Sequence, residues 1–108
     1  MKIGVSAKGG SLDAEVEPRF GRCAYFLIVD SETMHFEAFS NPATELGGGA
    51  GPRTVQEFQQ RGAEVVLTGQ VGPKAQQALE ASGLEVVAGV SGKVRAAVEK
   101  YLESKQTA

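Results

Sequence analysis

The chain has 108 residues with a formal net charge of −2 at pH 7, and 42% of its residues are hydrophobic. This length predicts one domain that spans residues 1–108. The slightly negative net charge argues against a nucleic-acid partner, because proteins that bind nucleic acids are normally basic. The sequence lacks an apolar run of membrane-spanning length and the apolar stretch of a signal peptide, so we expect a cytoplasmic protein without a membrane partner. The single cysteine excludes an internal disulfide and suits a reducing compartment.

The first half of the chain predicts three strands. Residues 2–6 (KIGVS) have the β-branched pattern of a strand, and residues 25–30 (YFLIVD) form the nearly continuous apolar run of a strand buried on both faces. Residues 34–39 (MHFEAF) alternate, with Met34, Phe36 and Ala38 on one side, and the short connection before them predicts a hairpin. Residues 7–23 show no sustained period, so we expect an irregular segment there.

The second half alternates helices with strands. A helix over 53–61 is predicted to stop at Gly62, and a second helix to begin at Pro73 and stop before Gly83. Residues 64–68 (EVVLT) and 85–88 (EVVA) are predicted strands. Ser91 is a candidate cap for a last helix, in which apolar residues recur at helical spacing: Val94, Ala97, Val98, Tyr101 and Leu102.

This order of elements predicts an α/β fold with a mixed sheet, in which strand 25–30 runs against the other four. One edge of that sheet then collects residues 7–22, 40–52, 69–72 and 89–92, which hold 11 of the 14 glycines. Ligands of open α/β sheets bind at the carboxyl ends of the strands, and the three helix N-termini expected at this edge favour anions. Basic side chains outnumber acidic ones in and beside these segments. The pattern therefore predicts an anion site.

Residues 47–51 contain four glycines directly before Pro52. Such a run indicates either close backbone approach to a bound anion or a flexible connection, and the sequence leaves both interpretations open. The candidate cofactor-binding residues lie in or beside the segments collected at the edge: Arg19, Phe20, Gly21, Arg22, Gly47, Gly48, Gly49, Gly51, Arg53, Thr68, Gly69, Gly72 and Lys74.

Cys23 is the candidate metal ligand, because a thiolate beside an arginine ligates iron; a small buried residue entering a strand is the other interpretation. A single cysteine does not hold a four-thiolate cluster, so a cluster would need other ligands or a second protomer. Asp13, Glu15 and Glu17 alternate in the irregular segment, where we expect a mobile, solvating stretch rather than a metal site.

Three segments, KIGVSAKGG, FGRCAYFLIVD and GGGAGPRTVQEFQQRGAEVVLTGQVGPKAQQALEASGLEVV, together resemble the dinitrogenase iron–molybdenum cofactor biosynthesis family over roughly residues 2–100. That family includes small nitrogenase-cofactor carriers, the C-terminal domain of the cofactor-core synthase and stand-alone proteins. Some of the carriers place a histidine in or near the glycine run. The sequence GGGAGPR has none and is more similar to the stand-alone branch.

The resemblance implies a three-layer ribonuclease H-like fold with sheet order 3-2-1-4-5, an antiparallel second strand and helices on both faces. It also implies a non-catalytic carrier of an iron–sulfur or iron–molybdenum type cluster, with cluster-assembly proteins as partners. We expect a monomer or a weak homodimer. Glycine loops, helix N-termini and basic side chains suit such an anionic cluster.

Three other functions use the same fold, the same edge or a glycine-rich loop: a nuclease, a nucleotide triphosphatase and a binding module. A two-metal nuclease would need carboxylates on the central strands at the ligand edge, and residues 2–6 and 64–68 offer none there. Residues 88–94 (AGVSGKV) lack the spacing of a phosphate loop and carry Val94 in place of its Ser or Thr. A binding module for a small phosphorylated metabolite, or for a regulatory partner protein, stays open as the alternative.

Overall fold

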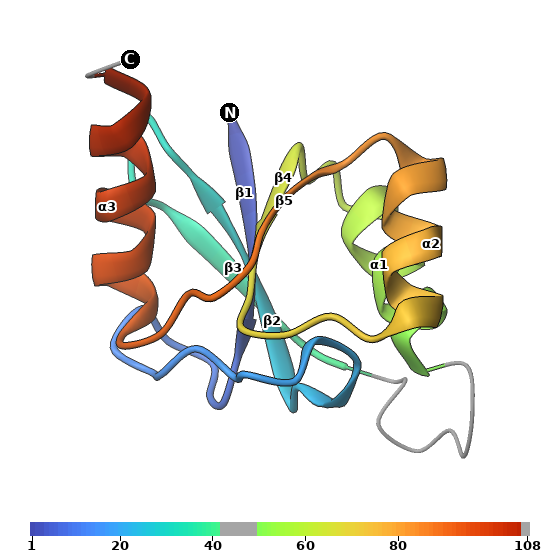
Figure 1. The fold of residues 1–108 in the computed structure, drawn as a ribbon. Coiled ribbons are helices and arrows are strands. Elements are labelled where there is room, and N and C mark those ends of the chain that lie inside the picture. The colour runs from blue at the N-terminus through green and yellow to red at the C-terminus, as the bar shows by residue number, and fades with distance from the viewer. Residues whose placement is uncertain (42–49, 107–108) are drawn as a thin grey trace.

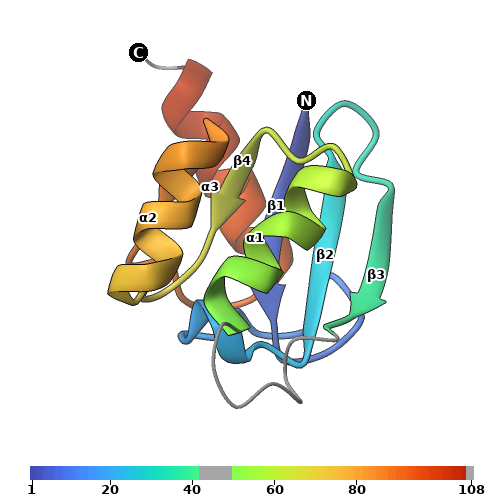
Figure 2. The ribbon, with the colours of Figure 1, turned by 90° about the vertical axis from the view of Figure 1, so that its right-hand side faces the viewer.

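A five-stranded sheet with helices on both faces forms the centre of the molecule. The structure, a computed structural model, describes residues 1–41 and 50–106. Its elements in chain order are β1 (Lys2–Ala7), the short 3₁₀ helix η1 (Phe20–Arg22), β2 (Tyr25–Asp30), β3 (Phe36–Ser40), α1 (Ala50–Gln60), β4 (Val65–Leu67), α2 (Pro73–Ser82), β5 (Glu85–Val87) and α3 (Val94–Gln106). One face of the sheet carries α3 and the other carries α1 and α2 (Figures 1 and 2).

The strand order is β3-β2-β1-β4-β5, which confirms the predicted ribonuclease H-like arrangement. The β2 strand runs antiparallel to both of its neighbours, whereas β1 pairs in parallel with β4, and β4 with β5. Because the other four strands share one direction, their carboxyl ends meet at one edge of the sheet. That edge also holds the first turns of α1 and α2 (Figure 2).

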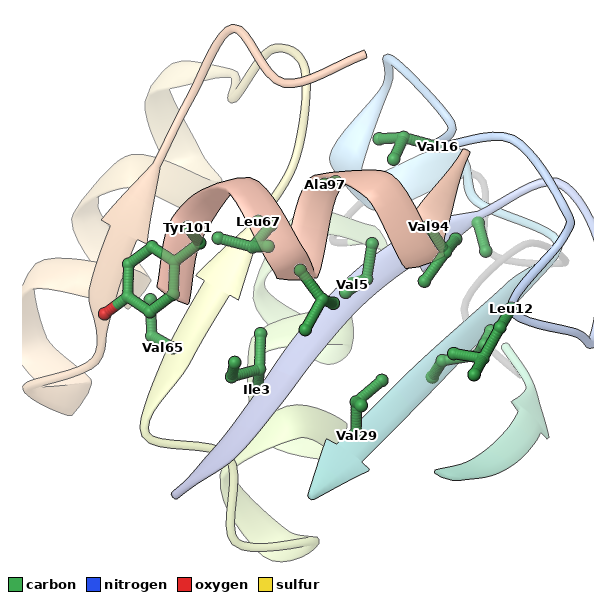
Figure 3. Packing of buried hydrophobic residues seen from close by; sticks show 13 residues of the cluster. Ile3, Val5, Leu12, Val16, Val29, Val65, Leu67, Val94, Ala97 and Tyr101 are labelled. Atoms are coloured by element: carbon green, nitrogen blue, oxygen red, sulfur yellow. The ribbon is translucent and has the colours of Figure 1, made fainter. Parts of the chain in front are cut away.

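Alternation along β2 divides the core into two layers. Leu27 and Val29 face α3 and join the buried side chains of β1 (Figure 3), while Phe26 and Ile28 face α1 and α2. All four side chains are buried. Coverage on both faces explains why apolar residues occupy successive positions of this strand.

The β3 strand is shorter than predicted because Met34 belongs to the turn before it. Met34 has a φ of 62°, in the left-handed region, and its N–H donates to the Asp30 carbonyl at 2.8 Å. Pairing with β2 therefore begins at Phe36, whose side chain is 39% exposed at the sheet edge. Phe39 makes the main core contact of this strand, with its ring centroid 5.4 Å from that of Phe26.

The irregular segment between β1 and η1 is held against the fold. Of the three carboxylates predicted to solvate it, Asp13 and Glu15 are exposed, and the prediction is wrong for Glu17 alone. Leu12 and Val16 are buried in the layer beneath α3. The N–H groups of Val16 and Glu17 donate to the carbonyls of Gly92 and Ser6 at 2.8 and 2.9 Å. Glu17 is itself buried. The segment therefore packs as part of the core layer.

The same segment closes the N-terminus of α3. The N–H groups of Val94 and Arg95 donate to the carbonyls of Ala14 and Leu12, each at 2.9 Å. The helix begins at Val94, three residues after Ser91, so the predicted Ser91 cap is wrong. Main-chain carbonyls take the role that a capping side chain usually has. One of the three helix N-termini expected at the anion site is thus occupied by the protein itself.

The backbone of this segment crosses the end of β4 at Gly69. A Cβ atom on Gly69 would lie 2.5 Å from the Pro18 Cα and 2.7 Å from the Pro18 carbonyl oxygen, so no side chain fits. Beside this close approach, the Gln70 N–H donates to the Pro18 carbonyl and the Phe20 N–H donates to the Gln70 carbonyl at 3.2 Å. Glycine at position 69 therefore permits the bridge that holds η1 in place.

We expect Gly69→Ala to lower the free energy of unfolding by about 2 kcal/mol, because the added methyl group must displace the Pro18 backbone. Gly72→Ala is the matched control, since a Cβ there meets nothing within 4 Å and the φ of Gly72 is −73°. Only about 0.5 kcal/mol is expected from the altered helix cap in that variant. Urea titration followed by circular dichroism measures both losses, and equal losses would contradict the close-contact explanation.

Candidate functional site

A groove lies at the carboxyl edge of the sheet, between η1 and the first turns of α1 and α2. Its volume is about 600 Å³. Figure 2 shows these pieces of chain close together at the lower end of the molecule. The groove brings together seven of the predicted binding residues: Arg19, Phe20, Gly21, Arg22, Gly51, Gly72 and Lys74.

Phe20 anchors the η1 wall of the groove. Its side chain is 1% exposed, and its ring packs on Phe58 of α1 with the centroids 5.7 Å apart. Arg19 and Arg22, on either side of it, are exposed. A buried ring between two exposed cations fixes the backbone while the guanidinium groups reach solvent. Phe20 therefore positions this wall by packing.

Positive charge dominates the described lining of the groove. Its ionisable residues are Arg19, Arg22 and Lys74, and no carboxylate is among the described lining residues. Arg19 is partly neutralised, because its Nε lies 3.2 Å from Oε1 of Glu17. Lys74 is exposed and makes no ion pair within the described part of the chain. An anion entering the groove meets net positive surroundings.

The N-terminus of α2 adds hydrogen-bond donors to this charge. Gly72 is its N-cap residue, with no side-chain cap, and Pro73 follows at the first helical position. The Gly72 carbonyl accepts the N–H of Gln76 at 2.9 Å, so the N–H groups of Lys74 and Ala75 precede the first helical hydrogen bond. With no Cβ at Gly72, these donors stay open to a ligand, an arrangement that favours anions.

Gly51 has a packing reason to be glycine. A Cβ atom at this position would lie 2.7 Å from the Cβ of Ala75, so α1 and α2 approach each other closely where both border the groove. Gly51 lines the groove as predicted, and its missing side chain also serves contact between the two helices. Gly47, Gly48 and Gly49 lie outside the described residues.

Three predicted binding residues are not part of the described lining. Arg53 points along α1, with its Nη2 3.9 Å from Oε2 of Glu57. Thr68 is fully buried, and its hydroxyl shares a 2.7 Å hydrogen bond with that of Ser6. Gly69 faces the Pro18 backbone described above. Sequence reasoning missed Gln70, which lines the groove; the only signal for it was its position directly after a predicted strand end.

Cys23 is 0% exposed and does not line the groove. The Asn41 Nδ2 donates to the Cys23 carbonyl at 3.0 Å and lies 3.4 Å from Sγ. Burial raises the pKa of the Cys23 thiol from its ordinary value of 9.0 to about 11, although the Asn41 hydrogen bond opposes this shift. The neutral thiol is therefore the stable form at neutral pH, whereas metal ligation requires the thiolate.

The donor chemistry of the site suits an anion better than a bare metal ion. Among residues 1–41 and 50–106, no group of three or more His, Cys, Asp or Glu side chains is placed to hold a metal ion. The groove instead presents cations and N–H groups. In the same described ranges, no helix combines the length and apolarity needed to cross a bilayer.

Comparison with known proteins assigns the chain to a family. The family model described as "Dinitrogenase iron-molybdenum cofactor" matches residues 1–104. The chain belongs to this family. Membership confirms the predicted resemblance and associates the chain with a cofactor-related role.

Two solved structures share the fold along nearly the whole chain, and a third protein matches it in sequence. The apo form of the orange protein from Desulfovibrio gigas is 45% identical, with a TM-score of 0.92, and the match covers 96% of this chain and 88% of that one. A putative NifB protein from Thermotoga, solved by NMR, is 30% identical with a TM-score of 0.82, over 96% and 89% of the two chains. An uncharacterised protein of Methanocaldococcus jannaschii is 26% identical over 97% of this chain and 88% of its own.

The raised pKa of Cys23 predicts a pH-dependent loss of stability. As pH rises, the unfolded thiol loses its proton near 9 and the buried thiol near 11, so deprotonation favours the unfolded state between these values. We expect this contribution to be intact below pH 9 and to fall by on the order of 2 kcal/mol by pH 11. Urea titrations of wild type and Cys23→Ala at pH 8 and 10.5 measure it. A difference between the two proteins that stays constant with pH would contradict the burial of the thiol.

Proposed function

We propose that the groove binds an anionic iron–sulfur or iron–molybdenum type cluster as cargo, and that the protein is a non-catalytic carrier in cluster assembly. The observation that carries this proposal is the convergence of Arg19, Arg22 and Lys74 with the N-terminus of α2 around a groove of about 600 Å³. Family membership supports the same class of cargo, because the family description names the iron–molybdenum cofactor of dinitrogenase.

The residues present fit an anionic cluster held by noncovalent contacts. Guanidinium, ammonium and N–H groups all donate hydrogen bonds, and each bond is strengthened by the negative charge of its acceptor. The described lining contains neither cysteine nor histidine, so the proposed contacts are ionic and hydrogen-bonding. Cys23, the metal ligand expected from the sequence, is buried outside the lining and is not among these contacts.

Exposed ionic contacts also suit the need of a carrier to release its cargo. Each such contact contributes about 1 kcal/mol or less, so a cluster leaves without the breaking of a metal–protein bond. Catalysis would need an acid, base or nucleophile at the ligand, and the described lining offers no carboxylate, histidine or cysteine. Binding without chemistry is the role that this set of side chains supports best.

We expect the protein, incubated anaerobically with ferric iron and sulfide, to acquire visible charge-transfer absorption, with a cluster mass retained in native mass spectrometry. Lys74→Ala and Arg22→Ala should each weaken binding about five-fold, which corresponds to the loss of one partly exposed ionic contact of about 1 kcal/mol. Binding should also fall as ionic strength rises.

Two control variants separate the groove from general charge and from thiolate ligation. Arg95→Ala removes a cation of α3 that lies 3.7 Å from Asp13 and outside the groove lining, so it should bind the cluster like the wild type. Cys23→Ala should also retain the absorption. Loss of absorption in Cys23→Ala with retention in Lys74→Ala would refute the ionic site and favour a thiolate ligand.

The uncapped N-terminus of α2 also supports a second candidate, a small phosphorylated metabolite, because phosphate is a common ligand of such helix ends. Inorganic phosphate is the probe for this alternative. A wild type that stays colourless with iron and sulfide, yet gains thermal stability with phosphate in a Lys74-dependent way, would replace the cluster with a metabolite.

A further inference from the structure

A second groove, of about 550 Å³, runs between β5 and α3 on the face opposite α1 and α2. None of its described lining residues also lines the first groove. The helix α3 packs on β1, and Val87 at the sheet edge stays only partly buried. The lining is largely apolar, with Leu67, Val87, Val90 and Ala97, and Tyr101 lies toward the far end of α3 from Val94 (Figure 3).

The strand beside this groove has an unpaired edge. The β5 strand is last in the sheet, and its one neighbour among the described strands is β4. The Glu85 N–H donates to the Glu64 carbonyl at 3.3 Å, and the Val87 carbonyl accepts the Thr68 N–H at 3.1 Å, so these residues direct their backbone groups toward β4. By alternation, Val86, the middle residue of β5, directs its backbone groups outward. Ala88, the residue after the strand, does the same, because the next N–H, that of Gly89, donates back to the Gly69 carbonyl at 2.7 Å. An exposed row of this kind is a template for another extended chain.

The rim of the groove carries a cation that has no ion-pair partner in the described part of the chain. Glu85 accepts a 3.0 Å hydrogen bond from the Tyr101 hydroxyl and lies 3.4 Å from Nζ of Lys105. Lys100 also lines the groove, and its side chain has no ion pair or hydrogen bond within residues 1–41 and 50–106. The groove therefore combines an apolar lining with one uncompensated positive charge.

We infer that this edge is a docking site for an extended segment of a partner protein, which adds to the sheet beside β5. Backbone groups of the segment pair with those of Val86 and Ala88. Every second side chain of the bound segment faces α3, because side chains alternate along an extended chain. An apolar side chain of the segment contacts Val87 and Val90, and an acidic side chain two positions away reaches Lys100. The motif that the surface recognises is thus apolar, any residue, acidic.

A second copy of this chain is a poorer occupant of the same edge. Pairing of β5 with its own copy about a twofold axis would keep both α3 helices on one face of the joined sheet. Both copies of Lys100 would then border the shared groove, while each Glu85 is already engaged by Tyr101 and Lys105 of its own chain. Like charges would meet without a compensating carboxylate, whereas an acidic partner segment supplies one.

The probe for this site is a fluorescein-labelled heptapeptide with Val at its third and Asp at its fifth position and Thr or Ser elsewhere, compared with the same peptide carrying Lys for Asp. Fluorescence anisotropy with the full chain should show binding of the Asp peptide that is at least about three-fold tighter than that of the Lys peptide. Lys100→Glu should reverse this preference. Lys74→Ala, in the first groove, should leave it unchanged, so failure here is distinguishable from failure of the proposed carrier function.

Val86→Pro removes an outward N–H, and we expect it to weaken binding of the Asp peptide about five-fold. Val86→Thr keeps that N–H and is the matched control, with circular dichroism to verify folding of both. If Val86→Pro does not fold, the charge reversal in Lys100→Glu decides alone. Equal binding of the two peptides, or unchanged binding in a folded Val86→Pro, would overturn the docking site. A concentration-dependent dimer in light scattering that Val86→Pro abolishes would assign the edge to a second copy and overturn the partner segment.

Discussion

The close passage of Pro18 over Gly69 is the contact on which the first groove depends. Two backbones touch there at a distance that no side chain permits, and hydrogen bonds through Gln70 join the crossing segment to the end of β4. Arg19 lies between the bonded residues, and Arg22 follows within one turn of η1. The placement of both cations therefore follows from a contact between main chains, which the buried ring of Phe20 reinforces.

A buried amide holds the opposite wall of the same groove. The Asn41 Nδ2, at the end of β3, donates to the Thr54 hydroxyl of α1 at 3.1 Å and to the Cys23 carbonyl at 3.0 Å. All three residues are buried, and a satisfied buried polar group favours one arrangement of the elements that it joins. The start of α1 is thereby fixed relative to the turn that carries the arginines. Sequence reasoning did not single out Asn41, since its role depends on partners that lie 13 and 18 positions away.

The sequence predicts most of the fold because its local signals agree with one another. The apolar run of β2 marks a strand covered on both faces, and the stops at Gly62 and Gly83 coincide with φ values of 84° and 78° at these residues. The strand directions then place the carboxyl edge of the sheet correctly. Contacts between segments that are far apart in the sequence leave no such local signal, so they could not be predicted. The hydrogen bond from Val16 to Gly92 makes the irregular segment part of the core. Glycine is required at positions 51 and 69 by close contacts with Ala75 and Pro18, which lie far away in the sequence.

The burial of Cys23 makes the natural chain suitable for site-directed labelling. A fully covered, protonated thiol reacts slowly with maleimides at neutral pH, so a cysteine introduced at an exposed position reacts in its place. Gly72→Cys would set a fluorophore or spin label beside the cationic groove, and Ala88→Cys would set one beside the free sheet edge. Ligand binding at the groove and at the sheet edge can then be followed separately by spectroscopy, while Cys23 stays in place.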